Sequence, residues 1–234
     1  MNFIEGEVIA FDKPLGWTSF QLLSKFRYKL SRKMGVRKIK VGHAGTLDPL
    51  ATGVLILCTG KATKRIEEFQ LQQKEYVATL KLGATTPSFD CETEEDSEYD
   101  TEHITGELIK EALLAFWGEI EQVPPSFSAC KVNGDRAYNL ARAGEAVELK
   151  PKKLRIDEIE LLAYDAPFAT IRVVCGKGTY IRALARDIGK ALLSGAYLTA
   201  LRRTRAGGFI ADECLTVDDI DTFLDTVEMK TNKD

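Results

Sequence analysis

The chain has 234 residues, of which 44% are hydrophobic and 29% charged, and its formal net charge is −3. This length allows one large domain or two small ones. No apolar run approaches the roughly 20 residues that a membrane-spanning helix requires, so we expect no membrane segment. The first twelve residues include Glu5 and Glu7 and lack the basic and apolar regions of a secretory signal. We therefore expect a cytoplasmic protein.

The five cysteines are spread along the chain, and no two of them form a C-x-x-C pair. Their odd number argues against a disulfide framework, and their spacing argues against a zinc site. Only two histidines are present, His43 and His103. A site built from several histidines is therefore excluded, and we expect no bound metal.

The charges are distributed unevenly, although their sum is small. No acidic residue occurs from Lys13 to Leu47, and basic residues gather in Lys25–Lys40, in Lys150–Arg155 and in Arg202–Arg205. Acidic residues gather in Asp90–Glu102. Separate basic clusters would suit the phosphates of a nucleic acid, which supply most of the nonspecific affinity. For each single cluster, solvated surface charge is the alternative.

The N-terminal part of the chain predicts both helices and strands. Thr18 can cap a helix whose apolar residues share one face, with basic residues on the other face. Those apolar residues are Leu22, Leu23, Phe26 and Leu30. The next predicted elements are a buried strand over Val54–Leu57, a helix over Ala62–Leu71 and a half-buried strand over Tyr76–Leu82.

The acidic stretch from Ala84 to Thr101 has few apolar residues, so we expect a surface loop with limited order. A helix is predicted from about Thr105 to Ala115, and Asn133-Gly134 predicts a tight turn between strands. The remaining elements are strands over Leu154–Tyr164, Phe168–Cys175 and Tyr197–Arg203 and helices over Tyr180–Leu193 and from Val217. Without a regular βαβ alternation, this order favours the α+β class, with a mixed, mostly antiparallel sheet flanked by helices and loops.

The most informative segment runs from Val41 to Leu55 and reads VGHAGTLDPLATGVL. Its glycines and proline predict a tightly shaped loop between strands, where backbone can approach a ligand closely. Because Asp48 precedes a proline, its backbone is extended or in a turn, and its carboxylate should project from the loop. The segment is neither a Walker A loop nor a dinucleotide-binding fingerprint. A turn-forming role for Asp48 is the alternative.

This segment resembles the catalytic motif of the TruB family of pseudouridine synthases, whose pattern G-H-x-G-x-L-D-P-x-A-x-G is met at every fixed position. The resemblance continues in Lys74-Glu75-Tyr76, in Gln122–Ala129, in Lys177–Arg182 and in Leu201–Thr204. It covers roughly Gly6 to Phe209 and implies the pseudouridine synthase fold. We expect a catalytic domain over residues 1–210 and a short acidic segment over residues 211–234, without a full RNA-binding PUA domain.

The resemblance assigns catalytic roles to three residues. It implies that Asp48 is the nucleophile, that Tyr76 stacks on the target base near the proton to be removed, and that Arg182 pairs with the catalytic aspartate. A packed strand residue is the alternative for Tyr76. Tyr180 and Arg182 are two residues apart, and on an extended segment such residues face the same side.

Five further residues are candidates for binding the substrate. The resemblance implies that His43 engages the RNA and holds the extruded base, and that Tyr180 and Leu201 line the pocket. Lys13 and Arg202 are additional candidates for contacts with the substrate. For His43, a packed or hydrogen-bonded loop histidine is the alternative.

The implied reaction isomerises a uridine at position 55, in the T arm of tRNA, to pseudouridine. A carboxylate acts as nucleophile, at C1′ or at C6, only when it is ionised, and an adjacent arginine stabilises the ionised form. No redox change or group transfer occurs, so no cofactor is expected. A uridine inside a folded loop must be flipped out of it. We expect the protein to act on tRNA as a monomer, without a protein partner.

Two other functions are open. A non-catalytic RNA-binding or tRNA-folding protein would need only the basic clusters, and a nucleoside hydrolase could use Asp48 as a general base. A binding protein has no need of a carboxylate, which repels phosphates, so Asp48, Tyr76 and Arg182 together favour the enzyme. The basic clusters and the lack of an acidic metal-binding cluster weigh against the hydrolase.

Overall fold

The computed structural model describes residues 1–128, 131–132, 135–137 and 149–230. The chain forms two compact units. The first unit comprises Met1–Tyr76 and Arg202–Asp234, and the second comprises Val77–Leu201. Strands β4 (Lys74–Leu82) and β12 (Ala196–Ala206) each have residues in both units.

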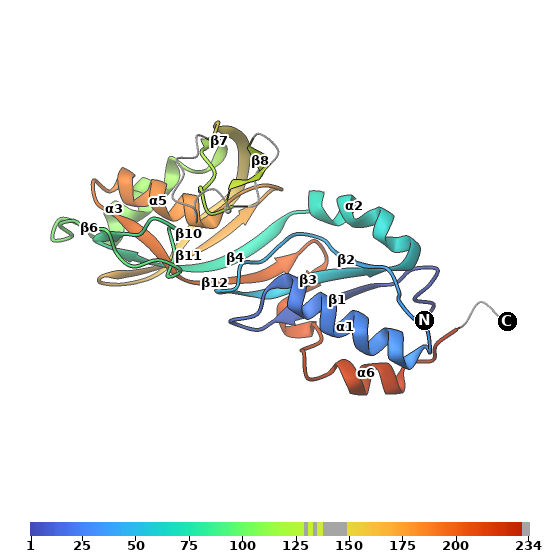
Figure 1. Cartoon of the computed structure of the whole chain (residues 1–234). Helices are drawn as coiled ribbons and strands as arrows, with labels where there is room; N and C mark the ends of the chain where they lie inside the picture. The colour runs from blue at the N-terminus through green and yellow to red at the C-terminus, as the bar shows by residue number, and fades with distance from the viewer. Residues whose placement is uncertain (129–130, 133–134, 138–148, 231–234) are drawn as a thin grey trace. The chain divides into compact units, whose positions relative to one another are not determined.

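The first unit combines short helices with antiparallel strands. Strand β3 pairs antiparallel with β1 on one side and lies next to β12 on the other, while β2 also pairs with β3 and β13 with β12. Helices α1 and α6 lie side by side (Figure 1). The elements are β1 (Val8–Lys13), α1 (Ser19–Lys33), β2 (Val41–His43), β3 (Ala51–Thr59), the 3-10 helix η1 (Gly60–Arg65), α2 (Ile66–Leu71), β13 (Phe209–Ile210), the 3-10 helix η2 (Ala211–Glu213) and α6 (Ile220–Thr226).

The second unit has the sheet order β12-β4-β11-β10-β7. Strand β10 pairs antiparallel with both β11 and β7, and helix α3 contacts β10 and α5. These pairings agree with the predicted α+β class and its mostly antiparallel sheet. The elements are β5 (Ala84–Thr85), β6 (Ser97–Glu98), α3 (Gly106–Leu114), β7 (Gly118–Gln122), β8 (Lys131–Val132), β9 (Asp135–Arg136), β10 (Lys152–Asp165), β11 (Phe168–Cys175) and α5 (Ile181–Ala191).

Most elements occur where the sequence predicts them, with somewhat different ends. Asn133-Gly134 lies outside the described residues, but β8 and β9 on either side of it pair antiparallel, which confirms the predicted strands. The predicted strand at Val54 is the centre of the longer β3, and the helix expected from Val217 begins at Ile220. Such differences arise because hydrophobic periodicity marks the middle of an element better than its ends.

Helix α1 begins at a capping box. The side chain of Thr18 accepts a hydrogen bond from the N–H of Gln21 at 3.0 Å, and the side chain of Gln21 accepts one from the N–H of Thr18 at 2.7 Å. These two bonds satisfy backbone donors that the first turn of a helix leaves unpaired. The predicted apolar face is buried, and it consists of Leu22, Leu23, Phe26 and Leu30.

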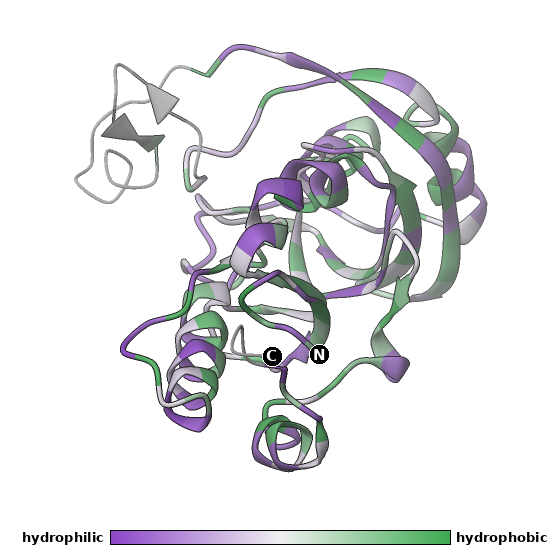
Figure 2. Ribbon diagram, turned by 90° about the vertical axis from the view of Figure 1, so that its right-hand side faces the viewer, coloured by the Kyte–Doolittle hydropathy of each residue, from purple (hydrophilic) through white to green (hydrophobic). Residues whose placement is uncertain are grey.

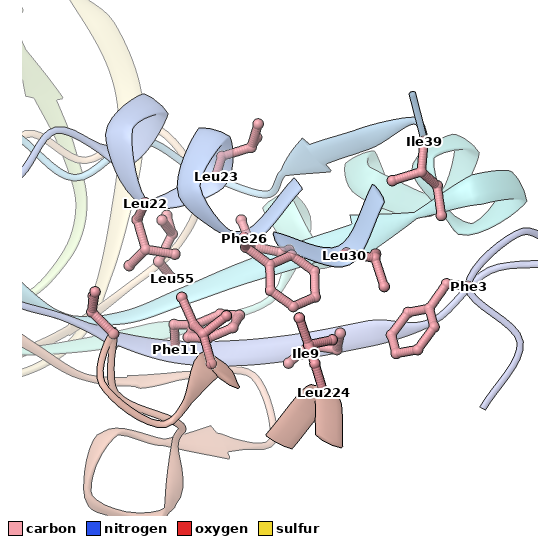
Figure 3. Packing of buried hydrophobic residues seen from close by; sticks show 13 residues of the cluster. Phe3, Ile9, Phe11, Leu22, Leu23, Phe26, Leu30, Ile39, Leu55 and Leu224 are labelled. Carbon is pink, nitrogen blue, oxygen red and sulfur yellow. The ribbon is translucent and has the colours of Figure 1, made fainter. Parts of the chain in front are cut away.

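The core of the first unit lies between α1, β1, β3 and α6, as Figure 3 shows. Phe26 of α1 meets Phe11 of β1 with the ring centroids 5.2 Å apart and the ring planes tilted by 60°. Leu55 of β3 and Leu224 of α6 belong to the same cluster. Because a helix of this length is only marginally stable alone, α6 depends on the apolar residues that it buries here.

The helices carry both hydrophilic and hydrophobic residues along their length, as the colours of Figure 2 show. This mixture is typical of helices that cover a core with one face. In the part of the chain that the structure describes, no helix is both long and apolar enough to cross a membrane.

The acidic stretch from Ala84 to Thr101 is more ordered than its composition predicts. Its strands β5 and β6 pair with each other. Glu95 accepts hydrogen bonds from Lys81 at 2.6 Å and from Tyr197 at 2.7 Å. The expectation of a loop with limited order was therefore wrong, because composition does not reveal partners that lie elsewhere in the chain.

We predict that Phe26→Ala lowers the free energy of unfolding by about 3–5 kcal/mol, because it leaves a cavity in the core. Phe20→Ala, on the same helix, should change this energy by less than about 0.5 kcal/mol, since Phe20 is 64% exposed. Urea unfolding followed by circular dichroism measures both effects. Equal losses for the two variants would contradict the packing shown in Figure 3.

Candidate active site

Asp48 lies half-buried in the loop between β2 and β3. Its carbonyl accepts a hydrogen bond from the N–H of Ala51 at 3.0 Å, which closes a turn. The Oγ of Ser19, at the start of α1, accepts from the N–H of Leu47 at 2.8 Å and donates to the carbonyl of Leu47 at 2.9 Å. The backbone on both sides of Asp48 is therefore fixed.

Gly53 of the motif allows β3 and β12 to pack closely. Its φ is +103°, a backbone conformation that residues with a side chain rarely adopt. A β carbon at this position would lie 2.1 Å from the carbonyl oxygen of Arg203. In the β1–β3 register, Gly53 lies opposite Lys13. Any other residue at position 53 would push the strand that follows Asp48 away from β12.

Arg203 of β12 supports the Asp48 loop with its side chain. It is buried, its Nε donates to the carbonyl of Val54 at 2.7 Å, and one terminal nitrogen donates to the carbonyl of Gly45 at 3.2 Å. We expected Arg202–Arg205 to form one surface cluster and so missed this role. The available signal was the period of two along a strand, which puts neighbouring residues on opposite faces.

Lys13, a predicted substrate-binding residue, is fully buried. Its Nζ donates to the carbonyls of Pro14 at 3.0 Å and Trp17 at 2.6 Å. Burial lowers the pKa of Lys13 from 10.5 to about 8, while the negative charge of Asp48 opposes this change. Lys13 therefore interacts with Asp48 electrostatically, and its ammonium group already has hydrogen-bond acceptors from its own loop.

His43 is half-buried at the end of β2, opposite Leu57 of β3. Burial lowers its pKa, and the positive charge of Arg203 lowers it further, so the imidazole is neutral at physiological pH. Its Nδ1 is buried and makes no hydrogen bond to any residue that the structure describes. A buried polar atom without a partner calls for an explanation, and this one favours the predicted contact with a ligand over simple packing.

Arg202, also predicted to bind the substrate, is occupied by carboxylates. Its terminal nitrogens donate to the two carboxylate oxygens of Asp12 at 3.0 and 2.8 Å, and one of them donates to Asp212 at 3.0 Å. Such a bidentate pair is among the stronger hydrogen-bonded arrangements. The charge of Arg202 is thus balanced within the first unit, and its contact with a substrate stays a prediction.

Part of the basic cluster Lys25–Lys40 is balanced in the same way by acidic residues of α6. Lys29 lies 2.9 Å from Asp221, and Lys33 lies 2.5 Å from Asp225. Exposed pairs of this kind contribute little to stability. They do reduce the positive potential along this part of α1.

In the second unit, Arg182 is buried, and its guanidinium group has several hydrogen-bonding and charged partners. Its terminal nitrogens donate to the carbonyls of Ser88 at 3.2 Å and Phe127 at 2.7 Å, and its Nε lies 3.5 Å from a carboxylate oxygen of Asp90. Asp90 is also buried, so the pair is shielded from water. The sequence predicts Asp90 in an exposed loop, because no local pattern points to a partner so far along the chain.

Tyr180 and Arg182 do not lie on an extended segment, so the argument from their spacing was wrong. Helix α5 begins at Ile181, which makes Tyr180 the N-cap residue and puts Arg182 in the first turn. The N–H of Tyr180 donates to the side chain of Gln122 at 2.9 Å. The pairing of Arg182 with Asp48 stays a prediction.

Tyr76 on β4 and Leu201 on β12 are half-buried. The strand that holds Tyr76 buries alternate residues, among them Ala78 and Leu80, as its pattern predicts. The roles of Tyr76 and Leu201 at a target base stay predictions.

The cysteines in the described residues are free thiols. Cys58 and Cys175 are buried, and Cys130 lies outside the described part of the chain. Across the described ranges, no group of three or more histidine, cysteine, aspartate or glutamate side chains could hold a metal ion.

Comparison with protein families gives two matches that together cover most of the chain. The TruB family pseudouridylate synthase (N terminal domain) matches residues 31–181, and the tRNA pseudouridylate synthase B C-terminal domain matches residues 182–233. Both matches place the protein in the class of pseudouridine synthases, which are isomerases.

Several curated relatives have the name tRNA pseudouridine synthase B. The one from Parabacteroides distasonis is 66% identical over 234 residues, which cover 100% of both chains. The one from Phocaeicola vulgatus is 67% identical over 230 residues, which cover 98% of each chain. The one from Flavobacterium johnsoniae is 54% identical over 209 residues, which cover 89% of this chain and 91% of the relative. The chain belongs to the TruB family of pseudouridylate synthases.

Solved structures confirm the predicted fold. A chain of a Cbf5-Nop10-Gar1 complex is similar with a TM-score of 0.71 and 31% identity, over 97% of this chain and 58% of that chain. A chain of an H/ACA RNP bound to a substrate RNA containing 2′-deoxyuridine gives 0.69 and 28%, over 97% of this chain and 57% of that chain. This chain thus spans less than two thirds of these two structural relatives.

We predict a pH dependence of stability that comes from Lys13. Its pKa is about 8 in the folded protein, against an ordinary 10.5, so between these values the unfolded chain binds more protons and stability rises with pH. Relative to Lys13→Arg, whose charge persists in this range, the wild-type protein should gain up to about 1.4 kcal/mol per pH unit. Thermal unfolding from about pH 7 to about pH 10.5 measures the difference, and parallel profiles would contradict it.

We also predict that Asp90→Asn lowers the free energy of unfolding by about 3 kcal/mol or more, because it removes the carboxylate charge from a buried ion pair with Arg182. Glu94→Gln is the control in the same acidic stretch; its side chain is exposed, so its effect should stay below about 0.5 kcal/mol. Urea unfolding measures both variants. If they behave alike, the fold does not need the ion pair.

Proposed function

We propose that this protein isomerises the uridine at position 55, in the T arm of tRNA, to pseudouridine, with Asp48 as the nucleophile. Asp48 stands at the aspartate of a motif that the chain meets at every fixed position, and this match carries the proposal. Its half-buried side chain on a fixed backbone suits a nucleophile. The shared name of relatives that are 63–67% identical supports tRNA as the substrate.

The reaction rearranges bonds within a single nucleotide. The bond between N1 and C1′ breaks, the uracil turns, and a bond forms between C5 and C1′. N1 gains a proton and C5 loses one, so atoms and electrons balance without a second reactant. Asp48 attacks either C1′ or C6, and it is released when the new bond is complete. The chemistry therefore requires no cofactor.

The other site residues would position the base and the nucleophile. Tyr76 would stack on the uracil near the proton that leaves C5, and Tyr180 and Leu201 would line the pocket. Arg182 would act with Asp48 as a unit, and Asp90 would position Arg182. This last role is supported by the 3.5 Å distance between the charged groups of Asp90 and Arg182 and by their burial.

The RNA must expose its target uridine. Flipping a base out of a folded loop costs a few kcal/mol, and a neutral His43 could offer it a hydrogen bond without adding charge. Arg37, Lys38 and Lys40 are exposed and form no ion pair with a described residue. We assign phosphate contacts to them, because lysine and arginine supply the electrostatic part of RNA affinity.

We further propose that the protein acts as a monomer in the cytoplasm, without a protein partner. Its catalytic domain would span residues 1–210, and residues 211–234 would form a short acidic segment. The match to a bacterial relative over 100% of both chains supports the cytoplasmic location.

We predict that Asp48→Asn lowers the rate of tritium release from 5-tritiated uridine in an unmodified T-arm stem-loop by about 10⁴-fold or more. The amide keeps the shape of the side chain but cannot act as the nucleophile. An RNA with cytidine at the target position is the substrate control, and Glu94→Gln, an exposed carboxylate, is the protein control. No release by the wild-type protein, with RNA binding retained, would support a non-catalytic RNA-binding protein instead.

A further inference from the structure

Three large apolar side chains are exposed on two segments next to Asp48. Leu15 is 64% exposed, Phe20 is 64% exposed and Leu50 is 38% exposed. Leu15 and Phe20 lie on either side of the turn that starts α1, and Leu50 follows Asp48 in its loop. An exposed apolar residue standing alone needs no explanation, so what matters is whether these three form one surface.

Hydrogen bonds between direct neighbours of these residues hold the two segments together. The N–H of Gly16, next to Leu15, donates to the carbonyl of Pro49, next to Leu50, at 2.9 Å. Ser19, next to Phe20, exchanges two hydrogen bonds with the backbone of Leu47. The three side chains therefore start from one fixed framework, and we call Leu15, Phe20 and Leu50 the apolar rim.

The apolar rim does not serve the core of the first unit. The residues of α1 that do so are buried on another face, as Figure 3 shows for Leu22 and Phe26. Phe20 and Leu50 could be polar without loss to that core. Exposed apolar side chains that gather in one place are candidates for an interaction site, and these three stand on the two bonded segments that hold the proposed nucleophile.

A pocket of about 400 Å³ lies next to these segments, since Pro14, Trp17 and Thr52 belong to its lining. Its charged lining residues are the cations Lys13, Lys25 and Arg202 and the carboxylates Asp12 and Asp218. The ammonium group of Lys25 lies 5.4 Å from the centre of the Trp17 ring. Lys25 forms no ion pair with any residue in the described ranges. Of the two carboxylates in the pocket, Asp12 is already bound by Arg202. An aromatic ring and exposed apolar side chains near a cation that forms no ion pair suit unpaired nucleobases and their phosphates better than they suit an apolar protein surface.

We propose that the apolar rim binds the unpaired nucleobases next to the target uridine, by stacking on Phe20 and by apolar contact with Leu15 and Leu50. This inference rests on the proposed function, since it takes RNA as the partner. Once the target base is flipped out, its neighbours lose a stacking partner, and an apolar surface beside Asp48 replaces it. The rim thereby stabilises the opened loop rather than the closed one.

The test measures the affinity of the T-arm stem-loop by fluorescence anisotropy, in the Asp48→Asn background and over a range of salt concentrations. Phe20→Ser and the double variant Leu15→Ser/Phe20→Ser should weaken binding by roughly 5- to 100-fold, with an unchanged dependence on salt. Lys25→Gln should instead reduce the slope of log affinity against log salt by about 0.7–0.9. Leu71→Ser, at an exposed leucine on α2, is the control and should leave affinity unchanged.

Stem-loops with an abasic nucleotide on either side of the target identify the base in contact. When the contacted base is removed from the RNA, the wild-type and Phe20→Ser proteins should bind this RNA with equal affinity. If the substitution instead disturbed the protein structure, the variant would still bind this RNA more weakly. Unchanged affinity of the Phe20→Ser variant, with wild-type RNA binding intact, overturns the inference alone. No tritium release despite normal binding overturns only the proposed function.

Sedimentation velocity separates RNA from a protein partner. The wild-type protein should sediment as one species over a wide range of concentration, with and without the rim substitutions. If it self-associates, and Phe20→Ser abolishes this without changing RNA affinity, the rim is a contact between copies of the chain and the inference is wrong.

Discussion

The position of Asp48 depends on the close packing of β3 against β12. A β carbon at position 53 would lie 2.1 Å from the carbonyl oxygen of Arg203, and the side chain of Arg203 donates to the carbonyls of Val54 and Gly45. Backbone carbonyls of a loop are difficult to satisfy away from water, and a buried guanidinium supplies several donors at once. The glycine makes the approach possible, and the arginine fixes the loop from within.

This support places buried positive charges close to the loop. Burial lowers the pKa of Lys13 to about 8. The negative charge of Asp48 raises this pKa, and the positive charge of Arg203 lowers it. Arg203 also helps to keep His43 neutral. The ammonium of Lys13 and the guanidinium of Arg203 both donate to carbonyls of their own unit. Lys13 and Arg203 therefore organise the backbone around the loop instead of facing a polyanion.

The sequence predicted the loop well because its chemistry is local. Asp48, its proline and the motif glycines stand within one short segment, so their spacing alone reveals a shaped loop. Arg203 could have been separated from Arg202 by the alternation of a strand. The pair of Asp90 and Arg182 could not have been found in this way, since its partners come from distant segments. For the same reason, composition suggested an unordered acidic stretch where Glu95 is bound by Lys81 and Tyr197.

The balance of charges also separates two tasks in RNA recognition. Arg202 is held by Asp12 and Asp212, and Lys29 by Asp221, so part of the basic surface that the sequence suggested is already neutralised. Phosphate contacts position a nucleic acid without reading its bases. Arg37, Lys38 and Lys40 remain exposed, whereas Leu15, Phe20 and Leu50, the exposed side chains of the apolar rim next to Asp48, are apolar. Distant phosphates would then supply affinity, and base contacts beside the nucleophile would decide which uridine is presented to Asp48.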